Sequence, residues 1–433
     1  MHRRHLLLAI GLIGLCMIPI GLLADHWPTW RGPMGDGVST EQDVPTHWDA
    51  KQHIRWRISL PDRGNGTPVV WGRFLFLPQA IEKEHRRTLM CLDRHTGQLL
   101  WQQGVSYKDQ EPTHATNPYC SPSPVTDGER VIVWYGSAGL YCYDLHGREQ
   151  WHIDLGKQQH VWGHGSSPIL FENLCILQFG PGARSFLIAV DKQTGNEVWR
   201  VAAPAFNKAT ANPSHPTGNE NADIFWGSWA TPIVVHAHGR PELILAWPQH
   251  VVGLNPRTGQ ELWRCAGLAD LVYCSPVYGE GIIVALGGYN GPSLAVKPGG
   301  QGDVTQSHRV WHEEKSPLRL GTGVIVAGHL YVNDMNGVID CIDLKTNKVR
   351  WRERPKASGK GDSWSSLVRA GQHIYAVNQA GDVFVFKANP NKYEQVAKNS
   401  LGEYSNSSLV ISDGELFLRT HESLWCIRSK KSD

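Results

Sequence analysis

The residues of this sequence that are best suited to ligand chemistry share one kind of position. Each stands shortly before a recurrent phrase built on a small residue, Ser or Thr, and Pro. They are His114, Asn117, His164, Trp226, Trp229, Arg319 and Trp364, with Tyr119, His160 and Tyr273 in equivalent places. Trp229 and Trp364 could stack a planar ligand while Arg319 and His164 hold its anionic groups, because a guanidinium matches planar carboxylates. The alternative is that these residues have a purely structural role, in which their side chains fill the narrow centre of the fold.

Motifs for metal or hydrolytic chemistry are missing from the sequence. It contains no C-x-x-C pair and no H-E-x-x-H run, so it carries no zinc signature. A metal held by His114, His160 and His164 would take its ligands from separate elements, which the spacing does not support. A carbohydrate-binding or hydrolytic protein is a further alternative. The recurrent aspartates are expected in turns, however, so no pair of carboxylates can be placed together for glycoside hydrolysis.

A second recurrent phrase indicates which elements position these residues. Its clear copies run from Asp or Asn to a Trp eight positions later, at 92–101, 190–199, 254–263 and 342–351. The pattern predicts a hairpin in which Asp caps the turn, Gly or Asn takes the positive-φ position, and the second strand carries the Trp. One buried Trp in each repeat would contribute roughly 4–6 kcal/mol of gross burial energy between neighbouring units.

The small-Ser-Pro phrase occurs eight times, which sets the number of repeats. Its copies lie at 66–70, 123–125, 166–170, 230–234, 274–277, 321–324, 365–368 and 407–410. The last repeat ends near Ile427 without a Trp strand, and the missing strand is found at 54–60. We therefore predict an all-β, eight-bladed β-propeller over 51–433, closed by the N-terminal strand pairing into the last blade, which leaves no long exposed edge.

The N-terminus predicts export. A basic start and an apolar run at 6–23 are typical of a signal peptide over 1–24, with an uncleaved membrane anchor as the alternative. Residues 25–50 form an N-terminal extension before the propeller. The expected location is the periplasm or cell envelope. A formal net charge of +2 without a Lys/Arg stripe argues against nucleic acid as a partner.

The cysteines are interpreted as packing residues. Cys91, Cys142, Cys341 and Cys426 share one repeat position that Ala or Gly fills elsewhere, which indicates a tight buried site. The sequence leaves open a single disulfide between two members of a second group, Cys120, Cys175, Cys265 and Cys274.

Together the D-x-x-T-G-x-x-x-W and small-Ser-Pro phrases resemble the repeat of the pyrroloquinoline-quinone-type (PQQ-like) propellers, over about residues 51–429. That resemblance implies two classes of relative: quinoprotein alcohol dehydrogenases, which use PQQ with Ca²⁺, and non-enzymatic members such as the propeller lipoprotein of outer-membrane protein assembly. The opening segment 27–39 also resembles the start of PQQ-like repeat proteins of planctomycete-type bacteria.

The dehydrogenases differ from this sequence at the residues that carry their chemistry. Their vicinal Cys-Cys pair is missing here, and their Ca²⁺ ligands and catalytic Asp find no match. The sequence therefore favours a non-enzymatic scaffold of the cell envelope that binds an envelope protein or an extended peptide. The alternative is a PQQ- and Ca²⁺-binding quinoprotein, or a dehydrogenase of alcohols or sugars. No cofactor is assigned.

Overall fold

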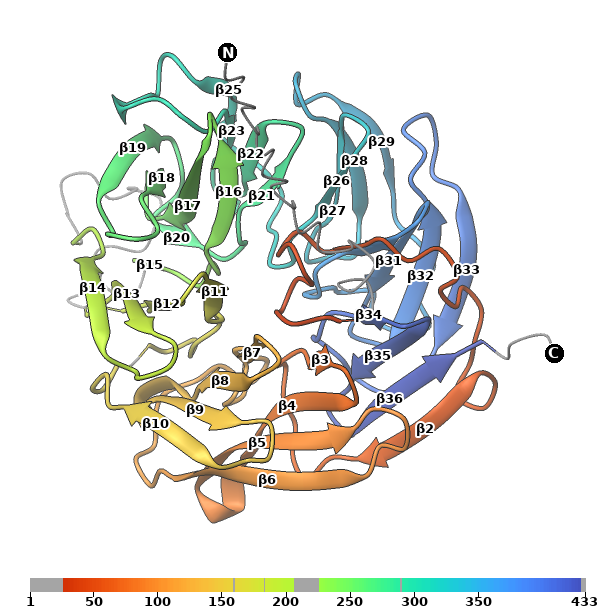
Figure 1. Cartoon of the computed structure of the whole chain (residues 1–433). Coiled ribbons are helices and arrows are strands. Elements are labelled where there is room, and N and C mark those ends of the chain that lie inside the picture. The colour runs from red at the N-terminus through yellow and green to blue at the C-terminus, as the bar shows by residue number, and fades with distance from the viewer. Residues whose placement is uncertain (1–25, 159, 183, 206–225, 289, 430–433) are drawn as a thin grey trace, which may run out of the picture.

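Eight antiparallel blades of four strands surround a central axis, which confirms the predicted all-β propeller (Figure 1). The computed structural model describes residues 26–158, 160–182, 184–205, 226–288 and 290–429. The predicted signal segment therefore lies outside the described residues. Within these ranges the only helices are the single-turn η2 (Glu82–Glu84) and η3 (Gly136–Ala138), and none could span a membrane.

Each blade runs from an inner strand at the axis to an outer strand at the rim. The first four blades are β3 (Val69–Trp71), β4 (Phe74–Ile81), β5 (Arg86–Asp93) and β6 (Leu99–Ser106); β7 (Val125–Thr126), β8 (Arg130–Trp134), β9 (Leu140–Asp144) and β10 (Glu149–Ile153); β11 (Ile169–Phe171), β12 (Leu174–Phe179), β13 (Phe186–Asp191) and β14 (Glu197–Ala202); and β16 (Ile233–Ala237), β17 (Arg240–Trp247), β18 (His250–Leu254) and β19 (Glu261–Ala266).

The remaining blades follow the same order. In blade 8 the outer strand comes from the N-terminal part of the chain. They are β21 (Val277–Gly279), β22 (Ile282–Ala285), β23 (Ser293–Val296) and β25 (Arg309–Glu313); β26 (Val324–Val326), β27 (His329–Asn333), β28 (Ile339–Asp343) and β29 (Val349–Glu353); β30 (Val368–Ala370), β31 (His373–Val377), β32 (Asp382–Lys387) and β33 (Gln395–Ser400); and β34 (Val410–Ser412), β35 (Glu415–Arg419), β36 (Ser423–Arg428) and β2 (Ile54–Ser59).

The ring closes where the sequence predicts. Strand β2 pairs antiparallel with β36, with Ser59 opposite Ser423. Behind this pairing, the fully buried Glu415 forms ion pairs with Arg55 of β2 and with Arg94 of blade 1. A buried carboxylate is tolerated only when such partners compensate its lost hydration. The closure therefore joins three segments that are far apart in the sequence.

Neighbouring blades are joined by the recurrent tryptophans. The indole Nε1 of Trp101 in blade 1 donates to the backbone carbonyl of Leu145 in blade 2 over 2.9 Å. The turn residue Gly97, with φ of 72°, lies against the Trp56 indole, where an added Cβ would come within 2.9 Å. Glycine is thus required there both for its dihedral angle and for the indole. The equivalent bonds join Trp56 to Arg94, Trp151 to Lys192, Trp199 to Pro256, Trp311 to Leu344 and Trp351 to Asn389.

Two blades depart from this rule. Blade 7 has Ala397 at the position of the Trp, and blade 4 is followed by a blade that carries an insertion between its third and fourth strands. Trp263 donates to the Glu242 carboxylate over 2.7 Å instead of to a carbonyl of the next blade. The insertion returns to blade 4, where its short strand β24 (Gly302–Asp303) pairs in parallel with β19. The extra loop thereby covers the outer edge of blade 4. A further parallel pair links β15 (Gly227–Ser228) with β20 (Leu271–Val272).

All eight described cysteines are buried and free, so the disulfide that the sequence left open is not formed. Burial raises the pKa of the Cys91 and Cys142 thiols to about 12. These side chains therefore behave as small apolar groups, as the shared repeat position predicts.

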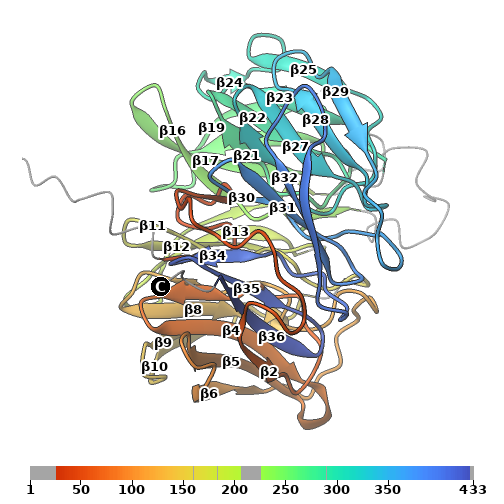
Figure 2. The same cartoon turned by 90° about the vertical axis from the view of Figure 1, so that its right-hand side faces the viewer.

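The N-terminal extension crosses the axis. Trp27 is fully buried and forms a backbone bridge with Val70 in blade 1. On the other side of the axis, the buried Arg31 guanidinium donates to backbone carbonyls of blades 6 and 7, those of Thr322, Gly323 and Leu367. The short strand β1 (Val38–Ser39) then pairs in parallel with β30. Figures 1 and 2 show this red segment passing from the centre of the ring over blade 7 to β2 at the rim.

Candidate functional site

Two rings of side chains surround the axis at the end opposite the extension. The first, which we call the hydroxyl ring, consists of one Ser or Thr from each small-Ser-Pro phrase or its weaker copy. Each hydroxyl oxygen accepts the backbone N–H of its counterpart in the preceding blade, over 2.8 to 3.3 Å. The bonds form a closed cycle through Thr67, Ser123, Ser167, Thr231, Ser275, Thr322, Ser366 and Ser408.

The second ring, which we call the wall ring, contains the residue two positions before each hydroxyl. All eight members of the wall ring line a single pocket of about 510 Å³, together with seven members of the hydroxyl ring. The members of the wall ring are Asn65, Ser121, Gly165, Trp229, Tyr273, Leu320, Trp364 and Asn406. The volume is within the usual range for small-ligand sites. The other lining residues are Trp30, His114, Asn117, Trp162, Leu318 and Met335.

An aromatic cluster forms one side of the pocket. The rings of Trp229 and Tyr273 have centroids 5.1 Å apart, and Trp162 lies 5.9 Å from Trp229. The Trp229 indole donates to the Gly163 carbonyl over 2.9 Å, and it packs over Gly165, where a Cβ would approach to 3.1 Å. The orientation of Trp229 is therefore fixed by its neighbours rather than by a ligand.

A loop from blade 2 holds the opposite side. The Asn117 side-chain amide donates to the carbonyls of Trp162 and His164, which ties this loop to blade 3. The carbonyl of Thr116 accepts from the amides of Asn65 and Asn406, which ties the same loop to blades 1 and 8. His114 stands exposed at the rim of this loop. These loops surround the open end of the pocket, which we call the mouth. Because hydrogen bonds join the loops to one another, the shape of the mouth is preorganised.

Four of the seven residues proposed from the sequence line the pocket, namely His114, Asn117, Trp229 and Trp364. His164 and Arg319 precede a ring hydroxyl by three positions instead of two. Because successive side chains of an extended segment point to opposite sides, the side chains of His164 and Arg319 point away from the pocket, behind the wall ring. Trp226, five positions before Thr231, is also turned away, and its indole donates to the Pro204 carbonyl.

Arg319 and His164, which the sequence suggested as partners for anionic groups of a ligand, instead lie close to carboxylates of the protein behind the wall ring. Arg319 is 2% exposed, and its guanidinium lies 2.5 Å from the Asp340 carboxylate. Burial lowers the pKa of Arg319, while Asp340 opposes that shift. His164 lies 3.6 Å from the buried Glu111 carboxylate. Burial acts to raise the pKa of Glu111, but His164 and then Ser137 bring it below its ordinary value.

The pocket itself carries little charge. Among its described lining residues there is no Asp, Glu, Lys or Arg, and His114 is the single histidine. What the lining presents instead are aromatic faces, amides, hydroxyls and a few aliphatic side chains. Such a surface can stack and hydrogen-bond a neutral ligand, but it offers no counter-charge to an ionised one.

Sequence comparison places the chain in a known family. The sequence matches the family profile described as outer membrane protein assembly factor BamB over residues 40–228, 247–385 and 303–433, which is most of the chain. The chain belongs to the BamB family. A comparison with curated protein sequences gives no significant match.

Solved structures share the fold of this BamB-family chain at low sequence identity. BamB from Moraxella catarrhalis is 11% identical with a TM-score of 0.59, covering 88% of this chain and 98% of its own. Quinohemoprotein alcohol dehydrogenase from Comamonas testosteroni is 12% identical with a TM-score of 0.65, covering 94% and 82%. The dehydrogenase ADHIIG from Pseudomonas putida HK5 is 10% identical, with a TM-score of 0.63 and coverage of 94% and 80%. These likenesses establish the architecture.

The described pocket residues do not fit PQQ and Ca²⁺. A quinone tricarboxylate needs cationic partners, and Arg319, the cation proposed for it, is turned into the wall toward Asp340. Calcium sites are built from oxygen ligands that include carboxylates, and no carboxylate lines the described pocket. The described residues also contain no group of three His, Cys, Asp or Glu side chains placed to hold a metal.

Several pocket residues escaped the sequence analysis. Asn65, Leu320 and Asn406 occupy the same position relative to the ring hydroxyl as Trp229, so counting back two positions in every repeat would have found them. Leu318, Met335 and Trp162 come from less regular segments. Trp30 belongs to the extension and reaches the pocket from the far end of the axis, which no repeat pattern predicts.

Proposed function

We propose that this protein is a non-catalytic binding scaffold of the cell envelope that acts through its mouth face. The observation that carries the proposal is the neutral lining of a preorganised pocket, whose described residues supply aromatic, amide and hydroxyl groups but no carboxylate for acid–base chemistry. The predicted signal segment and the BamB family agree with an envelope location. A role in outer-membrane protein assembly is the specific form of this proposal that the family description suggests.

The proposed partner is an extended segment of an envelope protein that lies across the rim of the mouth. Val161, next to the pocket residue Trp162, is 41% exposed, so a segment lying across the rim could cover its apolar side chain. Because Asn117 and Trp229 already fix the surrounding loops, binding would cost little ordering of the scaffold.

Site-specific photo-crosslinking in cells tests this proposal. A crosslinking amino acid at Val161 should trap one discrete envelope protein, and mass spectrometry should map the contact to an extended segment that also binds the purified chain. Val198, on the outer strand β14 of the same blade and 50% exposed, is the matched control. Absence of a discrete product from Val161, or the same product from Val198, would contradict the mouth as the partner surface.

Calorimetric titration with PQQ, with and without Ca²⁺, tests the alternative. We expect no saturable binding, because the described pocket offers no cation for the carboxylates. Micromolar binding that is lost in both Trp229→Ala and Arg319→Ala would replace the scaffold proposal with a quinoprotein.

A further inference from the structure

The hydroxyl ring presents hydrogen-bond donors to the axis. Each of its oxygens already accepts one backbone N–H, so each hydroxyl retains its own hydrogen to donate. Thr67 can direct this hydrogen to Ser407, 3.2 Å away, but the other lining members have the axis in front of them. All eight residues are at most 5% exposed. Donors held this deeply favour an occupant rich in oxygen atoms.

The wall ring above these hydroxyls is divided by polarity. Blades 4, 5 and 7 contribute the aromatic side chains Trp229, Tyr273 and Trp364, and blade 6 contributes Leu320. Blades 8, 1 and 2 contribute Asn406, Asn65 and Ser121. Trp30 of the extension also lines the pocket, from the far end of the axis. An occupant must therefore have an apolar face for the aromatic arc and hydrogen-bonding groups for the rest.

We propose that this axial pocket binds a neutral saccharide. A pyranose ring offers a face of C–H bonds that can stack on Trp229 or Trp364, and its hydroxyl groups can accept from the hydroxyl ring and exchange hydrogen bonds with the amide side. The lack of charged groups among the described lining residues matches an uncharged sugar. This inference goes beyond the proposed function, because it concerns the interior of the pocket rather than the protein partner at its rim.

Other occupants satisfy the pocket less completely. An apolar peptide side chain would use the aromatic arc but would leave the buried hydroxyl donors without acceptors, which is costly. An anionic ligand would be desolvated without a counter-charge, since the Arg319 guanidinium is committed to Asp340 within the wall.

Titration of the full mature chain with a panel of trisaccharides tests the inference. The neutral probes are maltotriose, cellotriose and triacetylchitotriose; the comparison probes are the anionic trigalacturonate and an uncharged Gly-Tyr-Gly peptide with blocked ends. Calorimetry and tryptophan fluorescence follow binding. We expect one neutral trisaccharide to bind with a Kd between about 10 μM and 1 mM, with no binding of trigalacturonate or of the peptide in that range.

Substitutions locate the binding. Trp229→Ala and Trp364→Ala should each weaken saccharide binding at least ~10-fold, and Trp229→Phe should restore part of it because stacking needs an aromatic ring. Ser366→Ala, which removes one ring hydroxyl, should weaken it several-fold. Trp71→Ala is the matched control, since Trp71 stacks on His26 outside the pocket and should bind like the wild type. Circular dichroism and melting curves verify that each variant is folded.

Several results would overturn the inference. They are saturation by no neutral trisaccharide below about 10 mM, tighter binding of trigalacturonate or of the peptide, and equal saccharide affinity in the wild type and in folded Trp229→Ala and Trp364→Ala. Failure here would leave the crosslink at Val161 unaffected, so the two proposals fail separately.

Discussion

The two ends of the propeller axis are built on the same eight inner strands but are used in opposite ways. At the extension end, Trp27 and Arg31 are buried, and the Arg31 guanidinium donates to carbonyls of two blades. At the mouth end, Trp229, Tyr273 and Trp364 remain partly exposed around a pocket. The first arrangement contributes to stability, whereas the second leaves large aromatic surfaces for a partner to cover.

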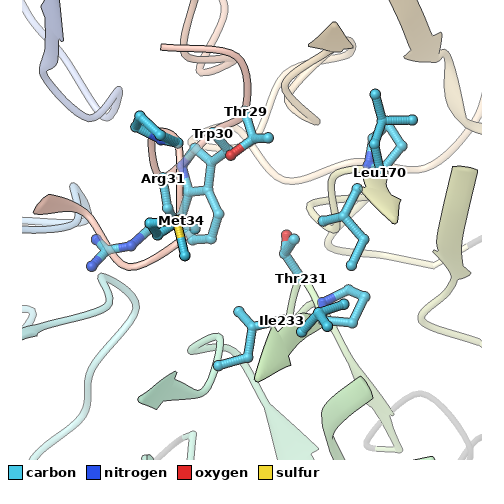
Figure 3. A pocket seen from close by; sticks show the side chains of 13 residues that line it. Thr29, Trp30, Arg31, Met34, Leu170, Thr231 and Ile233 are labelled. Carbon is cyan, nitrogen blue, oxygen red and sulfur yellow. The ribbon is translucent and has the colours of Figure 1, made fainter. Parts of the chain in front are cut away.

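The closure at the extension end is incomplete on one side. A notch of about 100 Å³ remains between the extension and the inner strands of blades 3 and 4. Figure 3 shows Trp30 and Met34 on one side of it, facing Leu170, Thr231 and Ile233 on the other. Met34 is 72% exposed there. The extension thus contacts blade 1 through Trp27, blade 2 through the Pro28 carbonyl, and blades 6 and 7 through Arg31. Its contrast with the mouth leads to four predictions.

The largest effect is expected from comparing one tryptophan at each end. Trp27→Ala should lower the free energy of unfolding by about 4 kcal/mol, because Trp27 is fully buried and its removal leaves a cavity. Trp364→Ala should cost less than about 1.5 kcal/mol, because its side chain is only half-buried. Urea unfolding of the two variants measures this difference. Equal losses would contradict the division of roles between the two ends.

A smaller effect is expected from the guanidinium that anchors the extension. Arg31→Met keeps part of the packing but deprives three buried carbonyls of their donor, so it should cost about 3 kcal/mol. Arg257→Met, in an exposed ion pair with Glu172, should cost under about 0.5 kcal/mol. Urea unfolding measures both, and a matching loss in the two variants would show that the Arg31 contacts contribute no more than a surface pair.

The mouth should respond to pH through His421, which lies beside Asn65. Burial, then Arg419 and Arg63, lower the pKa of His421 from 6.5 to about 4. Between these values the unfolded chain is protonated while the folded protein is not, so stability should fall as pH decreases from about 6.5 toward 4. Allowing for partial exposure, we expect a loss of about 1 kcal/mol.

Urea unfolding at about pH 7.5 and about pH 5 measures this loss in the wild type and in His421→Gln. The pKa values of His250 and His373 are also lowered by burial, and they contribute a slope that both proteins share. The difference between the two proteins therefore isolates His421. Identical pH dependence in wild type and variant would rule out its contribution.

The smallest effect concerns the thiols. Because burial raises the pKa of Cys120, in the blade 2 loop, to about 11 and that of Cys274, in blade 5, to about 12, neither should react with a thiol reagent in the native state. All eight described cysteines should react after unfolding in urea. Rapid modification of Cys120 alone would show that the mouth loop of blade 2 opens on its own.

Most of the fold could be predicted from the sequence, because the same sequence pattern recurs in successive blades. Eight small-Ser-Pro phrases and a Trp-less last repeat were sufficient to predict eight blades and the closure by β2, both of which are confirmed. The lining of the pocket followed from the sequence less completely. Arg319 and His164 were chosen for their chemistry, and they stand one position away from the axis-facing ring.

The sequence by itself determined the repeat and the closure of the ring, because these depend on local turn chemistry and on a side-chain alternation that recurs in every blade. Only the tertiary structure decided which polar side chains pair with one another behind the pocket, and where the extension runs. Arg31 and Leu367 are 336 positions apart, and Arg319 meets Asp340 behind the pocket. Such contacts depend on how the blades pack around the axis, and the repeat pattern carries no information about them.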